Sequence, residues 1–349
     1  MKNLIVFDLD GVLADVSLSY RDTVRETARL FFRFAPLWEE LPSPLFSLSE
    51  LARLKQSGGL NNDWDLSCRV IELLMSRLAP VHGRPQQDLC APIDPWDRLA
   101  EALNRCDLAP LIGFLRVSPQ PLSDLHRLAG RVKNPFVRSL YRGDVGSGNL
   151  IKQIFQEVYL GEEVFTRTYL IPPRLYSGQG YSERERLLPP ADLLTTLAAH
   201  HLLGIATGRP ANEAHHFLSR YALIPCFRKV LTLDDCLREQ DRILSTEGRS
   251  LSLSKPHPYM LDAIAAELGG GVGGRYYVGD LPDDMEAARR ARPGYRAIGL
   301  LQASADREAL RADLARAGAD FIVEDFTALA ELLEEASANA RAPGSRYFS

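Results

Sequence analysis

The chain has 349 residues, of which 46% are hydrophobic and 25% charged, and its formal net charge is −4. This composition is ordinary for a globular protein, and the length is sufficient for about two domains. The small negative charge gives no reason to expect nucleic acid or an anionic membrane as a partner. No segment approaches the ~18 consecutive apolar residues that a membrane span needs.

The cysteine content and the N-terminal segment favour a reducing, cytoplasmic location. The five cysteines are an odd number without Cys-x-x-Cys spacing, which is typical of free structural thiols. They are Cys68, Cys90, Cys106, Cys226 and Cys236. The apolar start is only a few residues long and is interrupted by Asp8 and Asp10, so we expect no signal peptide.

The first fifteen residues combine a predicted strand with two acidic side chains. The short apolar run 4–7 is typical of a strand buried on both faces, and Gly11 allows a sharp turn after it. Asp8 and Asp10 follow the carboxyl end of this strand, where open α/β sheets bind ligands. Residues i and i+2 of a strand share a side, and two adjacent carboxylates repel unless a cation or a shared proton lies between them. The pattern predicts a Mg²⁺ site with a carboxylate nucleophile beside an acid/base; a plain turn is the alternative.

The next part of the sequence, residues 17–186, is predicted to be mainly helical. Helices are expected at 16–34, from about 49, and at 66–78, 98–104, 121–129 and 150–159. The glycine-containing stretch 55–65 is predicted to be a polar loop and the proline-rich stretch 80–97 to be irregular. The segments 178–180 and 182–186 are expected to form a solvated connection.

From residue 189 onward, predicted helices alternate with short apolar strands. The helices are 191–200, 213–221, 258–268, 284–291 and 307–317, and the strands are 202–206, 229–233, 275–278, 296–300 and 320–323. Such alternation predicts a parallel sheet covered on both faces. We therefore expect an α/β core domain, 1–16 and 187–338, with a helical domain, 17–186, inserted after the first strand. Residues 339–349 are expected to form a flexible tail.

Two further polar clusters suit the binding of phosphate. Thr207 and Gly208 follow a buried strand, so their hydroxyl and backbone N–H groups could hold phosphate oxygens; a helix cap is the alternative. Lys255 lies in S-L-S-K-P-H-P, where two prolines stiffen the backbone. A fixed ammonium suits the neutralisation of a transferring phosphoryl group, and a solvated surface charge is the alternative.

A third cluster, V-G-D-L-P-D-D-M-E-A-A, again places acids after an apolar strand and a glycine. Asp280 and Asp284 are its candidate ligands. The alternative is that these acids cap a helix that begins near Pro282.

Taken in this order, the clusters resemble the four motifs of the haloacid dehalogenase superfamily of phosphotransferases and hydrolases. Residues 8–12, Asp-Leu-Asp-Gly-Val, are similar to its first motif, Thr207 to its second and Lys255 to its third. Gly279-Asp280 with Asp284 is similar to its fourth. The resemblance covers the first sixteen residues and most of 187–325, and it implies a Rossmann-like core.

The resemblance also implies a mechanism. Asp8 would attack phosphorus to form an aspartyl-phosphate. Asp10 would protonate the leaving oxygen and then deprotonate the water that hydrolyses the intermediate. Superfamily members that displace halide lack an acid at the position of Asp10, which argues against a dehalogenase.

The same resemblance assigns the remaining ligands. Mg²⁺ would be held by the Asp8 side chain, the Asp10 main-chain carbonyl and Asp280. Asp284 would hold either water ligands or the Lys255 ammonium. The phosphoryl oxygens would be bound by Thr207, Gly208 and Lys255.

A helical insert after the first motif is similar to the C1-type cap of subfamily IA, the group that includes phosphoglycolate phosphatase and β-phosphoglucomutase. The insert is about twice the expected length, so this analogy leaves much of 80–186 unexplained. The segment K-Q-S-G-G-L-N-N-D-W and the S-Y-R at 19–21 also resemble a poorly characterised branch of cap-bearing hydrolases, mostly microbial. Some eukaryotic members of that branch are fused to histidine-biosynthesis enzymes.

The candidate substrate contacts in the insert are Asn61, Asn62, Asp63 and Trp64. Two glycines before them allow a tight turn, and three polar side chains with an aromatic ring suit a sugar or a small acid. The alternative is a plain loop between two helices, with Trp64 in the core of the insert.

These observations favour a Mg²⁺-dependent phosphatase that acts on a small phosphorylated metabolite. A phosphomutase of the β-phosphoglucomutase type is the alternative enzyme, and no residue separates the two. A non-catalytic scaffold that binds a partner through the long insert is a third hypothesis, against which the intact acidic motifs count. The oligomeric state, monomer or homodimer, stays open.

Overall fold

The computed structural model describes residues 2–56, 62–79, 94–130, 133–304 and 306–339, and the chain forms two compact units. The first comprises 1–15 and 186–349, and the second comprises 16–185. These bounds lie one residue from the expected ones. Of the expected tail, Asn339 ends the last helix, and 340–349 lie outside the described residues.

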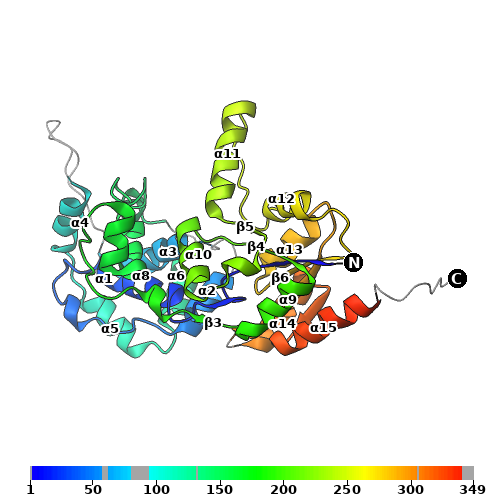
Figure 1. The fold of residues 1–349 in the computed structure, drawn as a ribbon. Helices are drawn as coiled ribbons and strands as arrows, with labels where there is room; N and C mark the ends of the chain where they lie inside the picture. The colour runs from blue at the N-terminus through cyan, green and yellow to red at the C-terminus, as the bar shows by residue number, and fades with distance from the viewer. Residues whose placement is uncertain (1, 57–61, 80–93, 131–132, 305, 340–349) are drawn as a thin grey trace. The chain divides into compact units, whose positions relative to one another are not determined.

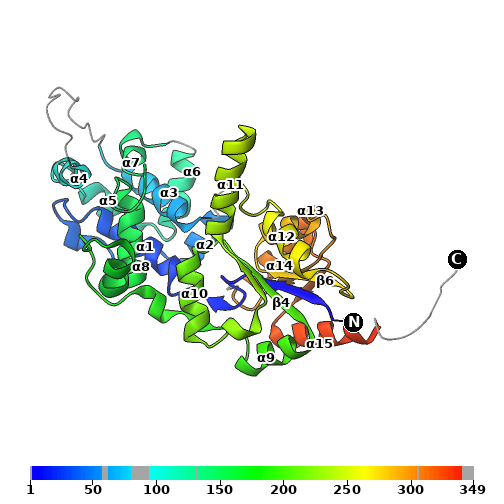
Figure 2. The ribbon, with the colours of Figure 1, turned by 45° about the horizontal axis from the view of Figure 1, so that its top comes forward.

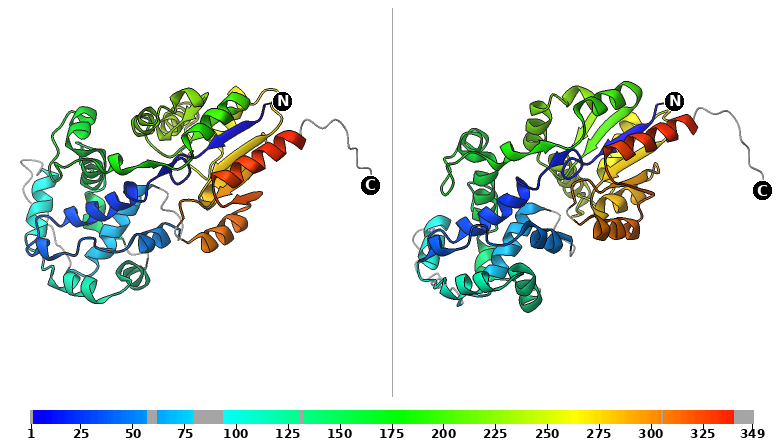
Figure 3. Two further views of the ribbon diagram at one scale, coloured as in Figure 1. Left: turned by 60° about the horizontal axis from the view of Figure 1, so that its bottom comes forward. Right: turned by 90° about the horizontal axis from the view of Figure 1, so that it is seen from below.

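The first unit is built on a six-stranded sheet in the order β5-β4-β1-β6-β7-β8, in which every neighbouring pair is parallel. Figure 3 shows β1, in dark blue, among strands from much later in the chain. The predicted Rossmann-like α/β core is therefore confirmed. The strands are β1 (Leu4–Phe7), β4 (Leu202–Ala206), β5 (Lys229–Leu231), β6 (Arg275–Gly279), β7 (Arg296–Leu300) and β8 (Phe321–Val323).

Helices cover both faces of this sheet. Figure 2 shows α9 and α15 on one side and α12 and α13 on the other. The helices of this unit are α9 (Ala191–His200), α10 (Ala211–Arg220), α11 (Leu233–Glu247), α12 (Tyr259–Leu268), α13 (Pro282–Arg290), α14 (Arg307–Ala317) and α15 (Phe326–Asn339), with a 3-10 turn η3 (Ile224–Cys226).

The central strand β1 is fully buried because both of its faces are apolar. Leu4 and Val6 pack into one cluster with α12 and α13, while Phe7 meets Phe227 edge to face on the opposite side at a centroid distance of 6.3 Å. Burying each such side chain stabilises the fold by roughly 1.5–3 kcal/mol. Since residues 4, 6 and 8 share one side of the strand, Asp8 leaves β1 toward the face that α12 and α13 cover.

A two-stranded antiparallel ribbon of β2 (Ala14–Asp15) and β3 (Arg186–Leu187) lies where the chain leaves the first unit and returns to it. In this ribbon Asp15 is the Cα partner of Arg186. Strands this short have no periodicity in the sequence, so neither was predicted. The ribbon brings the two ends of the insert together.

Within the described residues, the regular elements of the second unit are all helical (Figure 1). They are α1 (Tyr20–Phe31), η1 (Trp38–Glu40), α2 (Leu48–Gln56), α3 (Asp63–Met75), α4 (Pro95–Leu103), α5 (Ala109–Val117), α6 (Pro121–Ala129), α7 (Pro135–Ser139), α8 (Leu150–Tyr169) and η2 (Tyr181–Arg184). Tyr20 of α1 stacks on Tyr159 of α8 at a centroid distance of 4.3 Å. Buried Glu185 accepts hydrogen bonds from the hydroxyls of Ser19 and Tyr159, which ties the end of the insert to its beginning.

Several local predictions for the insert were wrong. The helix predicted at 150–159 continues to Tyr169, and α5 and α7 were not predicted. The predicted loop 55–65 is shorter, because α2 continues through Lys55 to Gln56 and α3 begins at Asp63. The predicted irregular stretch 80–97 ends earlier, because Asp94 caps α4, which begins at Pro95; residues 80–93 lie outside the described residues. The connection 182–186 is not solvated throughout, since Ser182 and Glu185 are buried.

The first unit and the cysteines require further corrections. The strand predicted at 229–233 ends at Leu231, and the following helix α11 was not predicted.

The cysteines within the described residues are free and buried, and Cys90 lies outside them. No helix in the described ranges combines the length and the apolar character that a bilayer span requires.

Candidate active site

Three of the predicted site residues follow directly on neighbouring strands. Asp8 comes after β1, Thr207 after β4 and Asp280 after β6, and the parallel pairing brings these strand ends to one edge of the sheet. From β1 the chain continues to β4 and β5 on one side, whereas β6, β7 and β8 extend the sheet on the other side. The direction in which strands are added reverses at β1, so the carboxyl end of β1 is the topological switch point, where open α/β sheets bind ligands.

Lys255 connects two of the predicted acids. Its Nζ lies 2.9 Å from Asp8 Oδ2 and 2.7 Å from Asp284 Oδ1, and its side chain is only 15% exposed. Burial disfavours the ammonium, but attraction to Asp284 and Asp8 outweighs that penalty and raises the pKa of Lys255 well above its usual value. The alternative of a solvated surface lysine is therefore wrong.

Asp284 is held by hydrogen bonds to both of its carboxylate oxygens. Oδ1 accepts from the Lys255 ammonium and from the buried Tyr277 hydroxyl at 2.9 Å, and Oδ2 accepts from the backbone N–H groups of Asp280 and Leu281. Of the two roles implied for Asp284, this geometry favours holding the Lys255 ammonium. The competing cap hypothesis is also partly right, since Leu281 is the N-cap of α13.

The carboxylates fit a divalent cation. Asp8, Asp280 and Asp284 are buried, and each offers an oxygen within 4.8 Å of the others. Asp8 Oδ1 is buried and has no hydrogen-bond donor beside it, so this oxygen is available to bind a cation. Burial, with repulsion from Asp284 and Asp10, raises the pKa of Asp8 to about 7 against the attraction of Lys255. Oxygen donors of this kind suit Mg²⁺, which would relieve that repulsion.

Gly11 allows this cluster to form. Its φ is +76°, and a Cβ at this position would lie 2.0 Å from Asp280 Oδ2. Any side chain here would therefore displace the carboxylate of Asp280. The turn that delivers the predicted first motif must consequently be made by glycine.

The turn after β4 holds Thr207 and brings Arg209 to Asp10. The buried Thr207 Oγ1 accepts from the Arg209 N–H at 3.2 Å, whereas the N-cap of α10 is Pro210, so Thr207 does not cap that helix. Gly208 is exposed, and a Cβ there would meet nothing within 4 Å. Arg209 Nε donates to Asp10 Oδ1 at 2.5 Å.

Two residues of this arrangement were not predicted from the sequence, namely Tyr277 and Arg209. Tyr277 is fully buried in β6, where its hydroxyl reaches Ala206 O, Lys255 and Asp284. The available signal was weak, because β6 contains two adjacent tyrosines, Tyr276 and Tyr277, and the sequence does not separate them. For Arg209 the signal was a basic residue directly after Thr207 and Gly208.

The candidate substrate contacts lie in the second unit, where α3 begins. Asn62 caps this helix by accepting from Trp64 N at 2.8 Å, and Asp63 pairs with Lys55 at 3.1 Å. The Lys152 ammonium lies over the half-buried Trp64 ring, 4.1 Å from the ring centroid. Asn61 lies outside the described residues.

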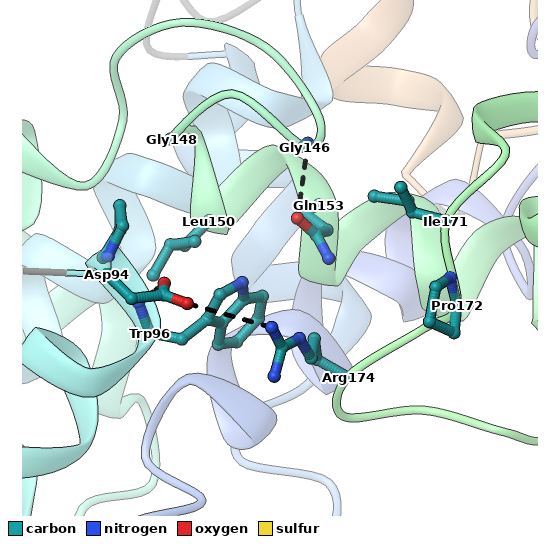
Figure 4. A pocket seen from close by; sticks show the side chains of 10 residues that line it. Asp94, Trp96, Gly146, Gly148, Leu150, Gln153, Ile171, Pro172 and Arg174 are labelled. Atoms are coloured by element: carbon teal, nitrogen blue, oxygen red, sulfur yellow. Dashed lines mark hydrogen bonds and ion pairs between the residues drawn. The ribbon is translucent and has the colours of Figure 1, made fainter.

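The second unit also contains a pocket of about 280 Å³ (Figure 4). Its wall includes Trp96, Leu150 and Ile171, and Arg174 lies 3.8 Å from Asp94 at its edge. Figure 4 shows Gln153 beside the Gly146 N–H, which donates to its side-chain oxygen. None of the site residues predicted from the sequence lines this pocket.

Comparison with known proteins identifies the family. A family model described as haloacid dehalogenase-like hydrolase matches residues 2–292. Because this match covers most of the chain, the chain belongs to the haloacid dehalogenase-like hydrolases.

Individual relatives are distant. An imidazoleglycerol-phosphate dehydratase from Phytophthora nicotianae is 23% identical over 289 residues, which are 82% of this chain and 41% of that protein. The chain thus spans less than half the length of this relative.

One solved structure supports the fold. A structural-genomics crystal structure has a TM-score of 0.62 at 20% identity, covering 96% of this chain and 99% of that one. Phosphatase Tt82 from Thermococcus thioreducens has a TM-score of 0.49 at 21% identity, covering 89% and 99%. At this identity the first match supports the fold alone.

Proposed function

We propose that this hydrolase is a phosphatase that cleaves small phosphate monoesters through an aspartyl-phosphate on Asp8, with Mg²⁺ as its metal. The observation that carries the proposal is the buried Asp8 carboxylate, which has one oxygen on the Lys255 ammonium and the other without a hydrogen-bond donor. A buried acid arranged in this way is suited to a nucleophile beside a cation site. When bound, Mg²⁺ supplies positive charge that offsets the repulsion between Asp8 and the phosphoryl oxygens.

The remaining groups have distinct roles in this proposal. Lys255, fixed by Asp284 and Tyr277, neutralises charge on the transferring phosphoryl group, and the Thr207–Gly208 turn binds its oxygens. Asp10 donates a proton to the leaving oxygen and later accepts one from the attacking water. The metal would be held by the side chains of Asp8 and Asp280 and by the main-chain carbonyl of Asp10.

The second unit would set substrate choice. Asn62, Asp63 and Trp64 remain candidate contacts to the organic part of the ester, with Asn61 as the fourth candidate of the sequence analysis. In the described structure Asp63 and Trp64 each lie beside a lysine, Lys55 and Lys152 respectively. We infer that this segment favours a polar, small substrate of the kind a metabolic phosphatase hydrolyses.

The test is phosphate release from a panel of esters, with Mg²⁺ or with EDTA, by the wild type and by Asp8→Asn. The panel contains phosphoglycolate, sugar phosphates, histidinol phosphate, nucleotides and p-nitrophenyl phosphate. Removing the nucleophile is expected to lower kcat/KM by at least about 10³-fold. The matched control is Asp192→Asn, which changes an exposed acid of α9 in the same unit.

The outcomes separate the competing hypotheses. Metal-dependent release that disappears in Asp8→Asn but not in Asp192→Asn supports the phosphatase. Conversion of a sugar phosphate into its isomer without net phosphate release supports the phosphomutase. A folded protein that binds Mg²⁺ and acts on no ester contradicts both enzymes and favours the scaffold.

A further inference from the structure

Arg209 is a buried cation to which the proposed reaction assigns no role. Its side chain is 1% exposed, and the carbon of its guanidinium lies 5.4 Å from the ring centroid of buried Phe217. The backbone of Arg209 is fixed at both polar groups, because its N–H donates to Thr207 Oγ1 and its carbonyl accepts from Leu233 N at 2.9 Å. Such a side chain has little freedom to move.

One partner of this cation is Asp10, the acid whose orientation the proposed reaction requires. Asp10 lies outside β1, and its side chain is 31% exposed, so packing restricts it less than it restricts Asp8. The 2.5 Å contact from Arg209 Nε to Asp10 Oδ1 is a charge-assisted hydrogen bond, which is both short and directional. A general acid must lie within hydrogen-bond reach of the proton's destination, so its orientation governs its efficiency.

We infer that Arg209 is a positioning residue that holds the Asp10 carboxyl group in its working orientation. This inference rests on the proposed phosphatase function. In the first step an Asp8 oxygen bonds to phosphorus, the bond from phosphorus to the ester oxygen breaks, and the Asp10 proton goes to that oxygen. In the second step water bonds to phosphorus and gives a proton to Asp10, and the bond from phosphorus to Asp8 breaks to release phosphate.

The test uses leaving groups that differ in their need for an acid. A p-nitrophenolate leaves readily without protonation, whereas an alkoxide does not. We therefore expect Arg209→Met to lower kcat/KM for an alkyl phosphate of the panel by about 10²-fold or more, the usual size of general-acid catalysis. For p-nitrophenyl phosphate the loss should stay below about tenfold. Arg209→Lys, which keeps the charge, should recover part of the loss on the alkyl ester.

A merely structural role predicts a different pattern. Equal losses on both esters in Arg209→Met, or no loss on either, would overturn the inference. The matched control is Arg275→Met, since the Arg275 guanidinium donates to the carbonyls of Gly269 and Pro293 near the start of β6, at the opposite end of that strand from Asp280. This variant should lose stability without changing the ratio of the two activities.

A second measurement does not depend on turnover. Unfolding of the wild type, Arg209→Met, Asp10→Asn and the double variant forms a thermodynamic cycle. A direct contact predicts that the effects on the unfolding equilibrium constant deviate from additivity by about tenfold. If the wild type hydrolyses no ester, the phosphatase proposal fails. A non-additive cycle then still supports Arg209 as the residue that holds Asp10, and an additive cycle overturns it.

Discussion

At the scale of single residues, the site depends on glycines that lie too close to carboxylate side chains for any Cβ atom to fit. The ideal Cβ position at Gly11 lies 2.0 Å from a carboxylate oxygen of Asp280, and at Gly279 it lies 2.3 Å from Asp284 Cβ. The approach at Gly11 depends on the pairing of β1 with β6, so it does not follow from local sequence patterns. The approach at Gly279 is local, because Asp284 lies in the first turn of α13, which follows β6. The sequence predicted which acids gather at this edge but not the spacing between them.

Gly11→Ala is expected to abolish Mg²⁺ binding. The added methyl group must displace the carboxylate of Asp280, and the positive φ adds strain of about 1 kcal/mol. Gly248→Ala is the matched control, because Gly248 has a similar φ of +65° but an added Cβ would meet nothing within 4 Å. Thermal unfolding with Mg²⁺ and with EDTA measures the effect. An equal Mg²⁺ stabilisation in the two variants would contradict the steric argument.

The raised pKa of Asp8 predicts a pH-dependent stability in the absence of metal. Its pKa of about 7 in the folded protein exceeds the ~3.9 of an unfolded aspartate. Protonation of Asp8 therefore stabilises the fold fully below about pH 4, and this stabilisation is lost as the pH rises through 7. Asp8→Asn removes this titration.

The measurement is urea unfolding in EDTA at pH 5 and at pH 8. The free energy of unfolding of the wild type minus that of Asp8→Asn should fall between the two values by about 1 kcal/mol or more. A difference that does not change with pH would show that burial does not raise the pKa of Asp8.

At the scale of elements, several strands and helices that face a core were predicted well, but α5 was not predicted, although it buries Leu111, Ile112 and Leu115. The strands β1, β4 and β7 have the predicted bounds because each contains a short run of consecutive buried, mainly apolar residues. Helix α6 has the predicted bounds because its buried residues follow the period of a helix.

Helix α11 was not predicted, although apolar residues recur at helical spacing along it, namely Leu233, Cys236, Leu237, Ile243 and Leu244. Of these, only Cys236 is buried. A second signal was local: Asp235 Oδ2 accepts from the backbone N–H and the hydroxyl of Thr232, as in a capping box.

The buried acids of the insert were not predicted from the sequence either, although one of them holds a whole segment of the chain in place. Glu157 of α8 is fully buried and accepts hydrogen bonds from the backbone N–H groups of Arg174, Leu175 and Tyr176, and from the side chain of Gln153. A glutamate within a helix gives no indication of its buried partners from sequence alone. Here it fixes the segment that contributes Arg174 to the pocket wall.

Glu157→Gln is expected to lower the free energy of unfolding by about 1–3 kcal/mol, since an amide nitrogen would then face buried N–H donors. Glu163→Gln, beyond the non-helical Gly161 that interrupts α8, is the control, because Glu163 is 91% exposed and lies 4.0 Å from Arg167. Its effect should stay within about 0.5 kcal/mol. Urea unfolding measures both variants. Equal effects would mean that the hydrogen bonds of Glu157 do not hold this segment.

At the scale of the whole molecule, the order of the motifs predicted an insert between the first two central strands. The motif order did not predict that the two ends of the insert lie together, as the β2–β3 ribbon holds them. The ends of the second unit are adjacent in the first unit, because Asp15 and Arg186 are Cα partners in that ribbon. The sheet, its covering helices and the predicted motifs all belong to the first unit. This division makes the insert removable in principle.

The last prediction is that the first unit folds and binds Mg²⁺ without the second. In this variant an Asn-Gly turn joins Asp15 to Arg186 in place of residues 16–185, because a two-residue turn of this type closes an antiparallel pair. Cooperative unfolding with Mg²⁺ stabilisation is expected, and hydrolysis of p-nitrophenyl phosphate should persist with less discrimination among the small esters. Asp8→Asn in the shortened chain is the control for residual activity. A cooperatively folded core that Mg²⁺ no longer stabilises would instead mean that the second unit supplies part of the metal site.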